Sequence, residues 1–168
     1  MKANPGAVRF DPLAEADLSA MLDIYNYYVL QTTATFHEQA QDLAGMRSIA
    51  CHADPRYRTW VIRRQENIVG YVLLTQFKSR SAYAATAEVT VYLQPDQTGQ
   101  GIGRLAIGHV ETAAREIGFH ALVAGITGTN TASLGLFAAC GYEKVAHYRE
   151  VGRKFGAWLD VVYYEKII

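Results

Sequence analysis

Residues 89–104 read VTVYLQPDQTGQGIGR, in which a β-branched and aromatic run is followed by a short turn and a glycine-rich segment. The run predicts a strand, and the apolar periodicity after Gly101 predicts that a helix begins there. A helix N-terminus has backbone N–H groups without partners and the positive end of the helix dipole. Because glycines leave that backbone open, the segment predicts a binding site for a phosphate or pyrophosphate.

Three phosphate-binding designs compete for these glycines. A nucleotide P-loop needs Lys and then Ser or Thr after its last glycine, but Gly103 is followed by Arg104 and Leu105. A Rossmann fingerprint opens its domain and has an acidic residue about twenty positions later. Here the glycines come past the middle of the chain, and the next predicted strand ends in Thr127-Gly128 without an acid. The remaining design is the coenzyme A pyrophosphate loop of acetyltransferases, although a lone G-x-G can also be a plain tight turn.

The overall composition is that of a globular protein. The chain has 168 residues, 50% of them hydrophobic, and a formal net charge of zero. Length and composition predict one domain over residues 1–168. The balanced charge indicates neither a nucleic-acid nor a membrane partner, since both call for a basic face. Residues 1–6 lack the apolar core of a signal peptide and no apolar run is long enough to cross a bilayer, so we expect a cytoplasmic protein.

Cysteine and histidine usage gives no sign of a metal site. Cys51 and Cys140 form no Cys-x-x-Cys pair, and the five histidines show no metal-ligand spacing. Cys140 could be considered as a nucleophile, but Gly141 after it is typical of a helix C-cap, which favours a structural cysteine.

Hydrophobic periodicity predicts elements in the order β-α-α-β-β-β-α-β-α-β-β. Strands are expected over residues 8–10, 58–64, 69–77, 87–93, 121–126, 142–151 and 158–165, and helices over 17–31, 42–52, 101–117 and 131–140. The three central strands form a meander whose first hairpin turns around residues 65–67. The run 122–126 is apolar, which is typical of a strand covered on both faces. Together these elements predict a mixed sheet with helices on both faces.

This order, with the glycine loop between the fourth strand and the third helix, resembles the GNAT superfamily of N-acetyltransferases over nearly the whole chain. The resemblance implies an α/β (α+β) fold with a mostly antiparallel central sheet of about seven strands. KSRSAY at 78–83 and AEVTVY at 87–92 look like the substrate and base segments of phosphinothricin acetyltransferases and their methionine sulfoximine or sulfone relatives. NTAS at 130–133, CGY at 140–142 and KFGAWLDV at 154–161 agree, and the last is distinctive of that subfamily.

The resemblance implies acetyl-CoA as co-substrate, a small-molecule amine acceptor, no metal, and a homodimer. It assigns coenzyme binding to the central strand, the glycine loop and the next helix start: Val91, Tyr92, Leu93, Thr98, Gly99, Gln100, Gly101, Ile102, Gly103, Arg104, Asn130 and Ser133. Thr98, preceded by Gln97, occupies the slot where the family usually has Arg or Gln, so we expect the backbone to do most of the pyrophosphate binding. Asn130 could bond the pantetheine arm, cap the helix that begins at Thr131, or do both.

Acetyl transfer to an ammonium requires a base, because the attacking nitrogen must be neutral. Glu88 is the candidate, since it begins the strand that should pair with the pantetheine arm; an ion pair with Arg80 is the alternative. A backbone N–H near Val91 should stabilise the charge that develops on the thioester oxygen. In many GNAT members a Tyr lies five positions before Tyr142 and acts as the general acid, and some phosphinothricin enzymes have His there. Here that residue is Phe137, so we assign no side chain to this role and expect water to serve.

An amino-acid acceptor also presents a carboxylate, for which the planar fork of Arg80 is suited. Lys78 is a weaker candidate because a lysine at a strand end is usually just solvated. Tyr83 and Phe36 would line the side-chain pocket, unless they are ordinary core aromatics. Thr127, where the fifth strand ends, completes the predicted acceptor-binding set.

Three functions are compatible with these residues. The first is an N-acetyltransferase for the α-amine of a small amino-acid-like compound such as phosphinothricin, methionine sulfoximine or methionine sulfone. The second keeps the reaction but takes a protein N-terminus or a polyamine; Lys78 and Arg80 disfavour a cationic acceptor. The third is a non-catalytic acyl-CoA-binding protein, which the absence of an acid at Phe137 favours and the presence of Glu88 disfavours.

Overall fold

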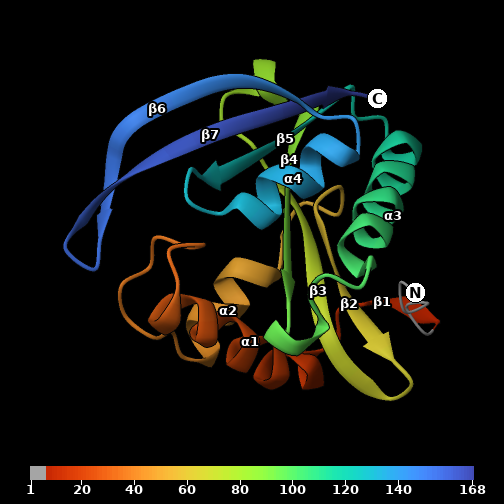
Figure 1. Ribbon diagram of the computed structural model, residues 1–168. Helices are drawn as coiled ribbons and strands as arrows, with labels where there is room; N and C mark the ends of the chain where they lie inside the picture. The colour runs from red at the N-terminus through yellow and green to blue at the C-terminus, as the bar shows by residue number, and fades with distance from the viewer. Residues whose placement is uncertain (1–6) are drawn as a thin grey trace.

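The computed structural model describes residues 7–168 (Figure 1). Residues 1–6, on which the signal-peptide expectation depends, lie outside the described residues. The strands are β1 (Val8–Pro12), β2 (Arg58–Arg64), β3 (Asn67–Gln76), β4 (Thr86–Leu93), β5 (Ala121–Thr127), β6 (Glu143–Lys154) and β7 (Ala157–Ile167). The helices are α1 (Leu18–Gln31), α2 (Leu43–Ala50), α3 (Ile102–Ile117) and α4 (Thr131–Ala139).

All seven strands form one sheet in the order β1-β2-β3-β4-β5-β7-β6. Every neighbouring pair is antiparallel except β4 and β5, which are parallel. The predicted order of elements, the central meander and the mostly antiparallel mixed sheet are therefore confirmed. One continuous sheet agrees with one domain over residues 1–168, which stays a prediction.

Several boundaries differ from the sequence prediction for local reasons. A short 3-10 turn, Glu15–Asp17, precedes α1, so the helix begins at Leu18. Asp42 is not helical; its side chain accepts a 2.8 Å hydrogen bond from the Gly45 N–H and caps α2. The hairpin turn narrows to Gln65 and Glu66, with Gln65 at φ 56°. Strands β6 and β7 are longer than predicted because they pair with each other as a hairpin that extends past the rest of the sheet.

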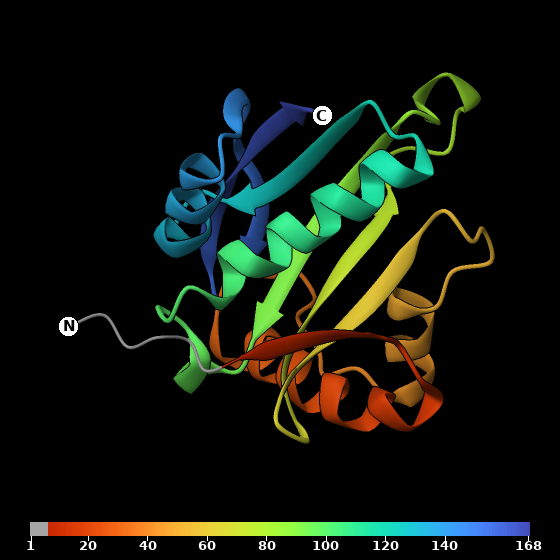
Figure 2. The ribbon, with the colours of Figure 1, turned by 90° about the vertical axis from the view of Figure 1, so that its right-hand side faces the viewer.

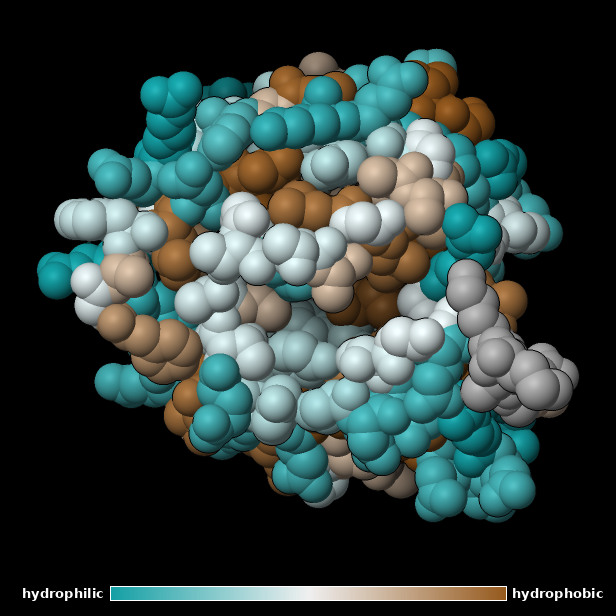
Figure 3. Space-filling view, in the orientation of Figure 1, coloured by the Kyte–Doolittle hydropathy of each residue, from teal (hydrophilic) through white to brown (hydrophobic). Residues whose placement is uncertain are grey.

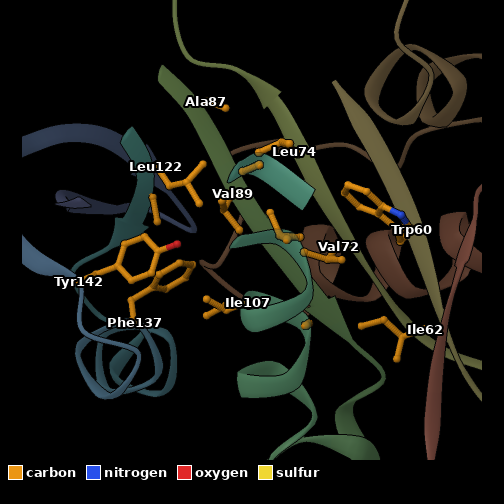
Figure 4. Close-up of a cluster of buried hydrophobic side chains, with 14 of the residues drawn as sticks. Trp60, Ile62, Val72, Leu74, Ala87, Val89, Ile107, Leu122, Phe137 and Tyr142 are labelled. Atoms are coloured by element: carbon orange, nitrogen blue, oxygen red, sulfur yellow. The ribbon is translucent and has the colours of Figure 1, made fainter. Parts of the chain in front are cut away.

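Two hydrophobic cores lie on opposite faces of the sheet. One contains buried residues of α3 and α4, including Ile107 and Phe137, packed on Val72, Val89 and Leu122 (Figure 4). The other contains α1 and α2 packed on Val61, Tyr71 and Leu73. This places helices on both faces, as predicted. No helix within residues 7–168 is both long and apolar enough to span a membrane.

The two parallel strands pair over a short distance and then part. Residues 86–88 of β4 pair with residues 121–123 of β5, whereas both strands continue beyond these pairs. Figure 2 shows the carboxyl ends of β4 and β5 diverging, and α3 lies across the sheet in front of them in this view. The parting leaves one edge of β4 without a neighbouring strand at the centre of the sheet.

Candidate active site

A cleft of about 880 Å³ opens where β4 and β5 part. It is lined by the end of β4, the glycine loop, the first turns of α3 and α4, and one residue of α1: Tyr28, Val91, Leu93, Thr98, Gly99, Gln100, Gly101, Gly103, Arg104, Asn130, Ala132, Ser133 and Leu136. Figure 3 shows the surface hollowed across the middle of this face, with hydrophobic residues at the bottom of the hollow. An apolar floor beside exposed backbone suits a ligand with a long, partly apolar arm.

The glycine loop presents backbone N–H groups to this cleft. Gly99 and Gly101 have φ of 72° and 84°, a region that side chains other than glycine rarely enter. Gly101 is the N-cap of α3, and no side chain caps it. The first N–H groups of α3 therefore remain available to an anion at the positive end of the helix dipole. This local geometry fits a pyrophosphate.

Polar side chains of the loop form hydrogen bonds with other protein groups, so the groups of the loop without protein partners are backbone N–H groups. The Thr98 hydroxyl donates to the Pro95 carbonyl at 2.9 Å, and Arg104 donates to the Ala139 carbonyl at 2.8 Å. The side-chain Oε1 of Gln100 accepts two hydrogen bonds of 3.0 Å from Arg64 of β2. Arg64 also donates to Gln97 at 2.8 Å, so it holds the loop from behind.

The free edge of β4 provides a second set of backbone groups. The N–H of Gln94 donates to the Val69 carbonyl at 2.8 Å, on the β3 side. Because backbone groups alternate sides along a strand, Val91 and Leu93 turn theirs toward the cleft. Tyr28 of α1 reaches this edge and donates its hydroxyl to the Leu93 carbonyl at 2.6 Å.

Two of the predicted coenzyme residues do not line the cleft. Ile102 is 1% exposed and packs in the core beneath α3. Tyr92 points to the opposite face, where its ring meets the rings of Tyr25, Tyr28 and Tyr71. Only their backbone could contribute to binding a coenzyme.

Asn130 caps α4, because its side chain accepts a hydrogen bond of 3.2 Å from the Ser133 N–H. The cap leaves the Asn130 amide NH₂ without a hydrogen bond to any residue in 7–168, at the wall of the cleft. Its two predicted roles are therefore compatible in this geometry.

Glu88 lies at the last paired position before β4 and β5 separate. It is half-buried, and within the described chain its carboxylate makes no ion pair, so the alternative of a bridge to Arg80 is not realised. Burial raises the pKa of the Glu88 carboxyl above its ordinary value, and a hydrogen bond from the Gly125 backbone partly offsets the rise. An unpaired carboxylate with a raised pKa is suited to accept a proton near neutral pH.

The predicted acceptor residues of the β3–β4 connection lie together. Lys78 and Arg80 are exposed. The Lys78 Nζ lies 4.9 Å from the centroid of the Phe77 ring and 5.0 Å from that of Tyr83. The Phe77 ring in turn lies 6.4 Å from the ring of Tyr163 on β7. This segment therefore brings two cations and an aromatic cluster to one end of the sheet.

Phe36 and Thr127 lie at the other end of β5. The Thr127 hydroxyl donates to the Thr33 carbonyl at 2.7 Å, and Thr127 is only 5% exposed. Phe36 packs beside Gly152 of β6, so a side chain at that glycine would collide with its ring. The buried Lys154 donates to the Thr35 carbonyl at 2.7 Å and holds the same loop. Thr127 therefore has a structural partner, whereas Phe36 is 40% exposed and belongs to neither hydrophobic core.

Comparison with known proteins agrees with this geometry. The acetyltransferase (GNAT) domain family matches residues 12–163. The chain belongs to the GNAT acetyltransferases. A phosphinothricin N-acetyltransferase of Streptomyces coelicolor is 37% identical over 95% of both chains. An L-methionine sulfoximine/L-methionine sulfone acetyltransferase of Salmonella typhimurium is 33% identical over 89% of this chain and 88% of its own.

A solved structure extends the agreement to the coenzyme. The GNAT phosphinothricin acetyltransferase (Pat) of Sinorhizobium meliloti, in complex with AcCoA, superposes with a TM-score of 0.90 at 27% identity, covering 96% of this chain and 88% of that one. This GNAT protein is thus an acetyl-CoA-dependent N-acetyltransferase, and the alternative of a non-catalytic acyl-CoA-binding protein is set aside.

This GNAT enzyme lacks the usual acid of the superfamily at Phe137. The Phe137 ring is buried and makes an edge contact with Tyr142 at 5.0 Å between ring centroids. Cys140 nearby is a poor nucleophile, because burial raises the pKa of its thiol. Neither residue offers covalent or acid catalysis, so Glu88 stays the candidate for the titratable group that assists the reaction.

Sequence reasoning missed three residues that line the cleft. Ala132 and Leu136 belong to α4, and Leu136 reaches within 2.8 Å of a Cβ built on Gly103. Tyr28 comes from α1, and only the packing of α1 against β4 brings it to the site. Ala132 lies within the NTAS segment at 130–133 and could have been included from it, whereas Leu136 and Tyr28 belong to no motif.

Proposed function

We propose that this enzyme transfers acetyl to the α-amine of a small amino-acid-like acceptor of the phosphinothricin, methionine sulfoximine or methionine sulfone type. The main observation is the position of Glu88, which is unpaired within the described chain and lies where β4 and β5 part. The exposed cations Lys78 and Arg80, on the connection that follows β3, favour an acceptor with a carboxylate. The relatives of Streptomyces coelicolor and Salmonella typhimurium are named for acceptors of this chemical class.

In this proposal each group has one task. Glu88 takes a proton from the acceptor ammonium, directly or through water, and so produces the neutral nitrogen that attacks. The Val91 N–H, on the free edge of β4, donates a hydrogen bond to the oxygen that gains negative charge. The N–H groups of the glycine loop and the start of α3 hold the pyrophosphate. Acetyl-CoA supplies the thioester. As its C–S bond breaks, the attached nitrogen gives up its second proton to water and the departing thiolate takes one from water; no dedicated acid is needed because a thiol with a pKa of about 8.5 is a good leaving group.

A panel of amines tests the acceptor class. Thiol release would be followed with phosphinothricin, methionine sulfoximine and methionine sulfone, with their α-amides, with a peptide that has a free N-terminus, and with a polyamine. We expect the free amino acids to be acetylated and the amides to react poorly, because amidation removes the charge that Arg80 would bind. Equal turnover of acid and amide would contradict the proposal and favour the peptide acceptor.

We also propose that the enzyme is a homodimer. Large apolar side chains lie exposed along the β6–β7 hairpin, among them Tyr148, Val151, Phe155 and Trp158, the last two 60% and 61% exposed. β6 is moreover an edge strand, whose unpaired backbone can be covered by a second copy. Light scattering should give the mass of two chains, and a monomer would contradict this.

The cytoplasmic location stays a prediction, which cell fractionation can test.

A further inference from the structure

Gly125 is exposed in the middle of a buried strand. It is the only exposed residue of β5, whose other positions are buried, so the prediction of a strand covered on both faces is wrong at this residue. Leu122, Ala124 and Ile126 belong to the core on the α3 face, so Gly125 faces the other side of the sheet by strand alternation. Within residues 7–168, the helices of that face, α1 and α2, form a core with β2 and β3 to which Gly125 does not belong.

The same face carries Glu88. Glu88 pairs with Val123, two residues before Gly125 and on the same side of β5. The backbone of Gly125 also donates the hydrogen bond that lowers the pKa of the Glu88 carboxyl against the effect of burial. Gly125 is thus an exposed residue next to the proposed base Glu88.

Tyr163 lies over this glycine. The two residues are paired in the register of β5 and β7. A Cβ built on Gly125 would lie 3.2 Å from two ring carbons of Tyr163 and 3.3 Å from its hydroxyl oxygen. The absence of a side chain at Gly125 therefore allows the Tyr163 ring to lean over the strand toward Glu88. The rings of Phe77 and Tyr148 make edge contacts with the Tyr163 ring, at 6.4 Å and 5.9 Å between ring centroids.

The Tyr163 hydroxyl has no partner that would explain its position. Within residues 7–168 it makes no hydrogen bond, although it is only half-buried. Burial and the Glu88 charge raise the pKa of Tyr163 above its ordinary value, so the hydroxyl keeps its proton and remains a donor. A donor of this kind beside a carboxylate base suits a ligand that presents an amine to one group and an oxygen to the other.

We propose that Tyr163 is a specificity-determining residue of the acceptor site: its ring forms the wall opposite Glu88, and its hydroxyl donates a hydrogen bond to an oxygen of the acceptor. This inference rests on the proposed function, because it assumes an acceptor that carries such an oxygen on its carboxylate or side chain. Gly125 is the floor between the two groups.

The test compares Tyr163→Phe with Tyr164→Phe. Tyr164 is the adjacent residue on β7 and packs against the core on the opposite face, so it controls for loss of a tyrosine hydroxyl from this strand. We expect Tyr163→Phe to raise the acceptor KM by roughly three- to tenfold, the usual effect of losing one neutral hydrogen bond, with the acetyl-CoA KM unchanged. Tyr164→Phe should leave both constants close to those of the wild type. An unchanged acceptor KM in Tyr163→Phe overturns the proposal.

Gly125→Ala provides a second variant that keeps the tyrosine. Its added methyl group would displace the Tyr163 ring, so it should also raise the acceptor KM at unchanged acetyl-CoA KM. Methionine sulfone and methionine then show which acceptor oxygen accepts the Tyr163 hydrogen bond. A raised KM with both compounds assigns the bond to the carboxylate, and a raised KM with the sulfone alone assigns it to the side-chain oxygens.

Failure of this inference and failure of the proposed function give different results. The wild-type amine panel decides the acceptor class, and the two variants are measured with whichever acceptor of that panel reacts best. A peptide acceptor with a normal KM in both variants would overturn both proposals, whereas an amino-acid acceptor with a normal KM would overturn only the role of Tyr163.

Discussion

Glu88 combines the position and the environment that a general base requires. It lies where the central strands part, it has no ion-pair partner within residues 7–168, and burial raises the pKa of its carboxyl. Leaving a carboxylate half-buried and unpaired is unfavourable for folding, so a purely structural role would not explain it. In the proposed function, Arg80 would complement Glu88 as an exposed fork for the acceptor carboxylate, eight positions before it along the chain.

Replacing Glu88 with Gln should remove the proposed base while keeping a side chain of nearly the same size and shape. We expect turnover at pH 7 to fall by roughly 10²- to 10⁴-fold, the usual loss on removal of a general base. The ratio of wild-type to Glu88→Gln turnover should be smaller at pH 9, where a larger fraction of the amine is neutral without a base. Steady-state kinetics at both pH values checks this, with an unchanged dissociation constant for coenzyme A as the control. Near-normal turnover at pH 7 would reassign Glu88 to structure.

Replacing Arg80 with Lys should keep the charge and lose the bidentate geometry. We expect the acceptor KM to rise far more than the acetyl-CoA KM. Amidating the acceptor should cause a similar loss in the wild type and little further loss in Arg80→Lys, because both changes delete one interaction. Additive losses in this double-mutant cycle would show that Arg80 and the acceptor carboxylate do not meet.

The loop between β4 and α3 has the backbone geometry that an anion site requires, and neighbouring side chains hold the loop in place. Two glycines at positive φ turn the chain, and α3 begins without a side-chain cap. Arg64, on the β2–β3 hairpin, bonds to Gln97 and Gln100 behind the loop. Gly103 has a different role: a Cβ there would lie 2.8 Å from Leu136, so this glycine permits α3 and α4 to pack closely.

Replacing Gly101 with Val should weaken coenzyme binding. Valine at φ 84° is strained, and its side chain would stand between the helix N-terminus and a phosphate. Calorimetry should show a dissociation constant for coenzyme A at least roughly tenfold higher, as expected for displacing several charge-assisted hydrogen bonds. Gly108→Ala, in the exposed middle of α3 with open space around its Cβ, is the matched control. Unchanged coenzyme binding in a folded Gly101→Val protein would defeat the assignment.

The whole molecule is built from two cores on a sheet that splits at its centre. β1 is one edge strand of the sheet. Near it, the His109 ring of α3 packs against the rings of Phe10 and Trp60, at 4.6 Å and 5.1 Å between ring centroids. The His109 Nε2 atom is buried without a hydrogen-bond partner among the described residues. Burial lowers the pKa of His109 below its ordinary value. Protonating this ring therefore opposes the packing of α3 on the sheet.

The fold should lose stability as pH falls below about 6.5, the pKa of histidine in an unfolded chain. Below that value the unfolded chain binds a proton that folded His109 does not, so the free energy of unfolding decreases until the folded pKa is reached. Burial also lowers the pKa of His52, which adds to the effect. His109→Phe should show a smaller fall in Tm between pH 7 and pH 5 by scanning calorimetry. Equal pH dependence in both proteins would contradict this account.

Features that depend on neighbouring residues could be predicted without the structure. Apolar periodicity predicted the order of strands and helices, and the glycines before α3 predicted the positive φ and the uncapped helix start on which the proposed anion site depends, since backbone conformation and helix ends are local properties. The sequence also singled out Glu88, whose charge stands out in an apolar strand. Helix and strand ends shifted by a few residues because caps and pairing partners, rather than propensity, set them.

How distant segments meet at the site follows from the packing of the whole chain. The parting of β4 and β5 created the cleft, and the packing of α1 brought Tyr28 to the free edge of β4. The register of β5 and β7 placed Tyr163 over Gly125, a glycine that the apolar run had presented as ordinary core. These contacts join residues far apart along the chain, and which of them meet depends on strand register and helix packing, which no local pattern encodes.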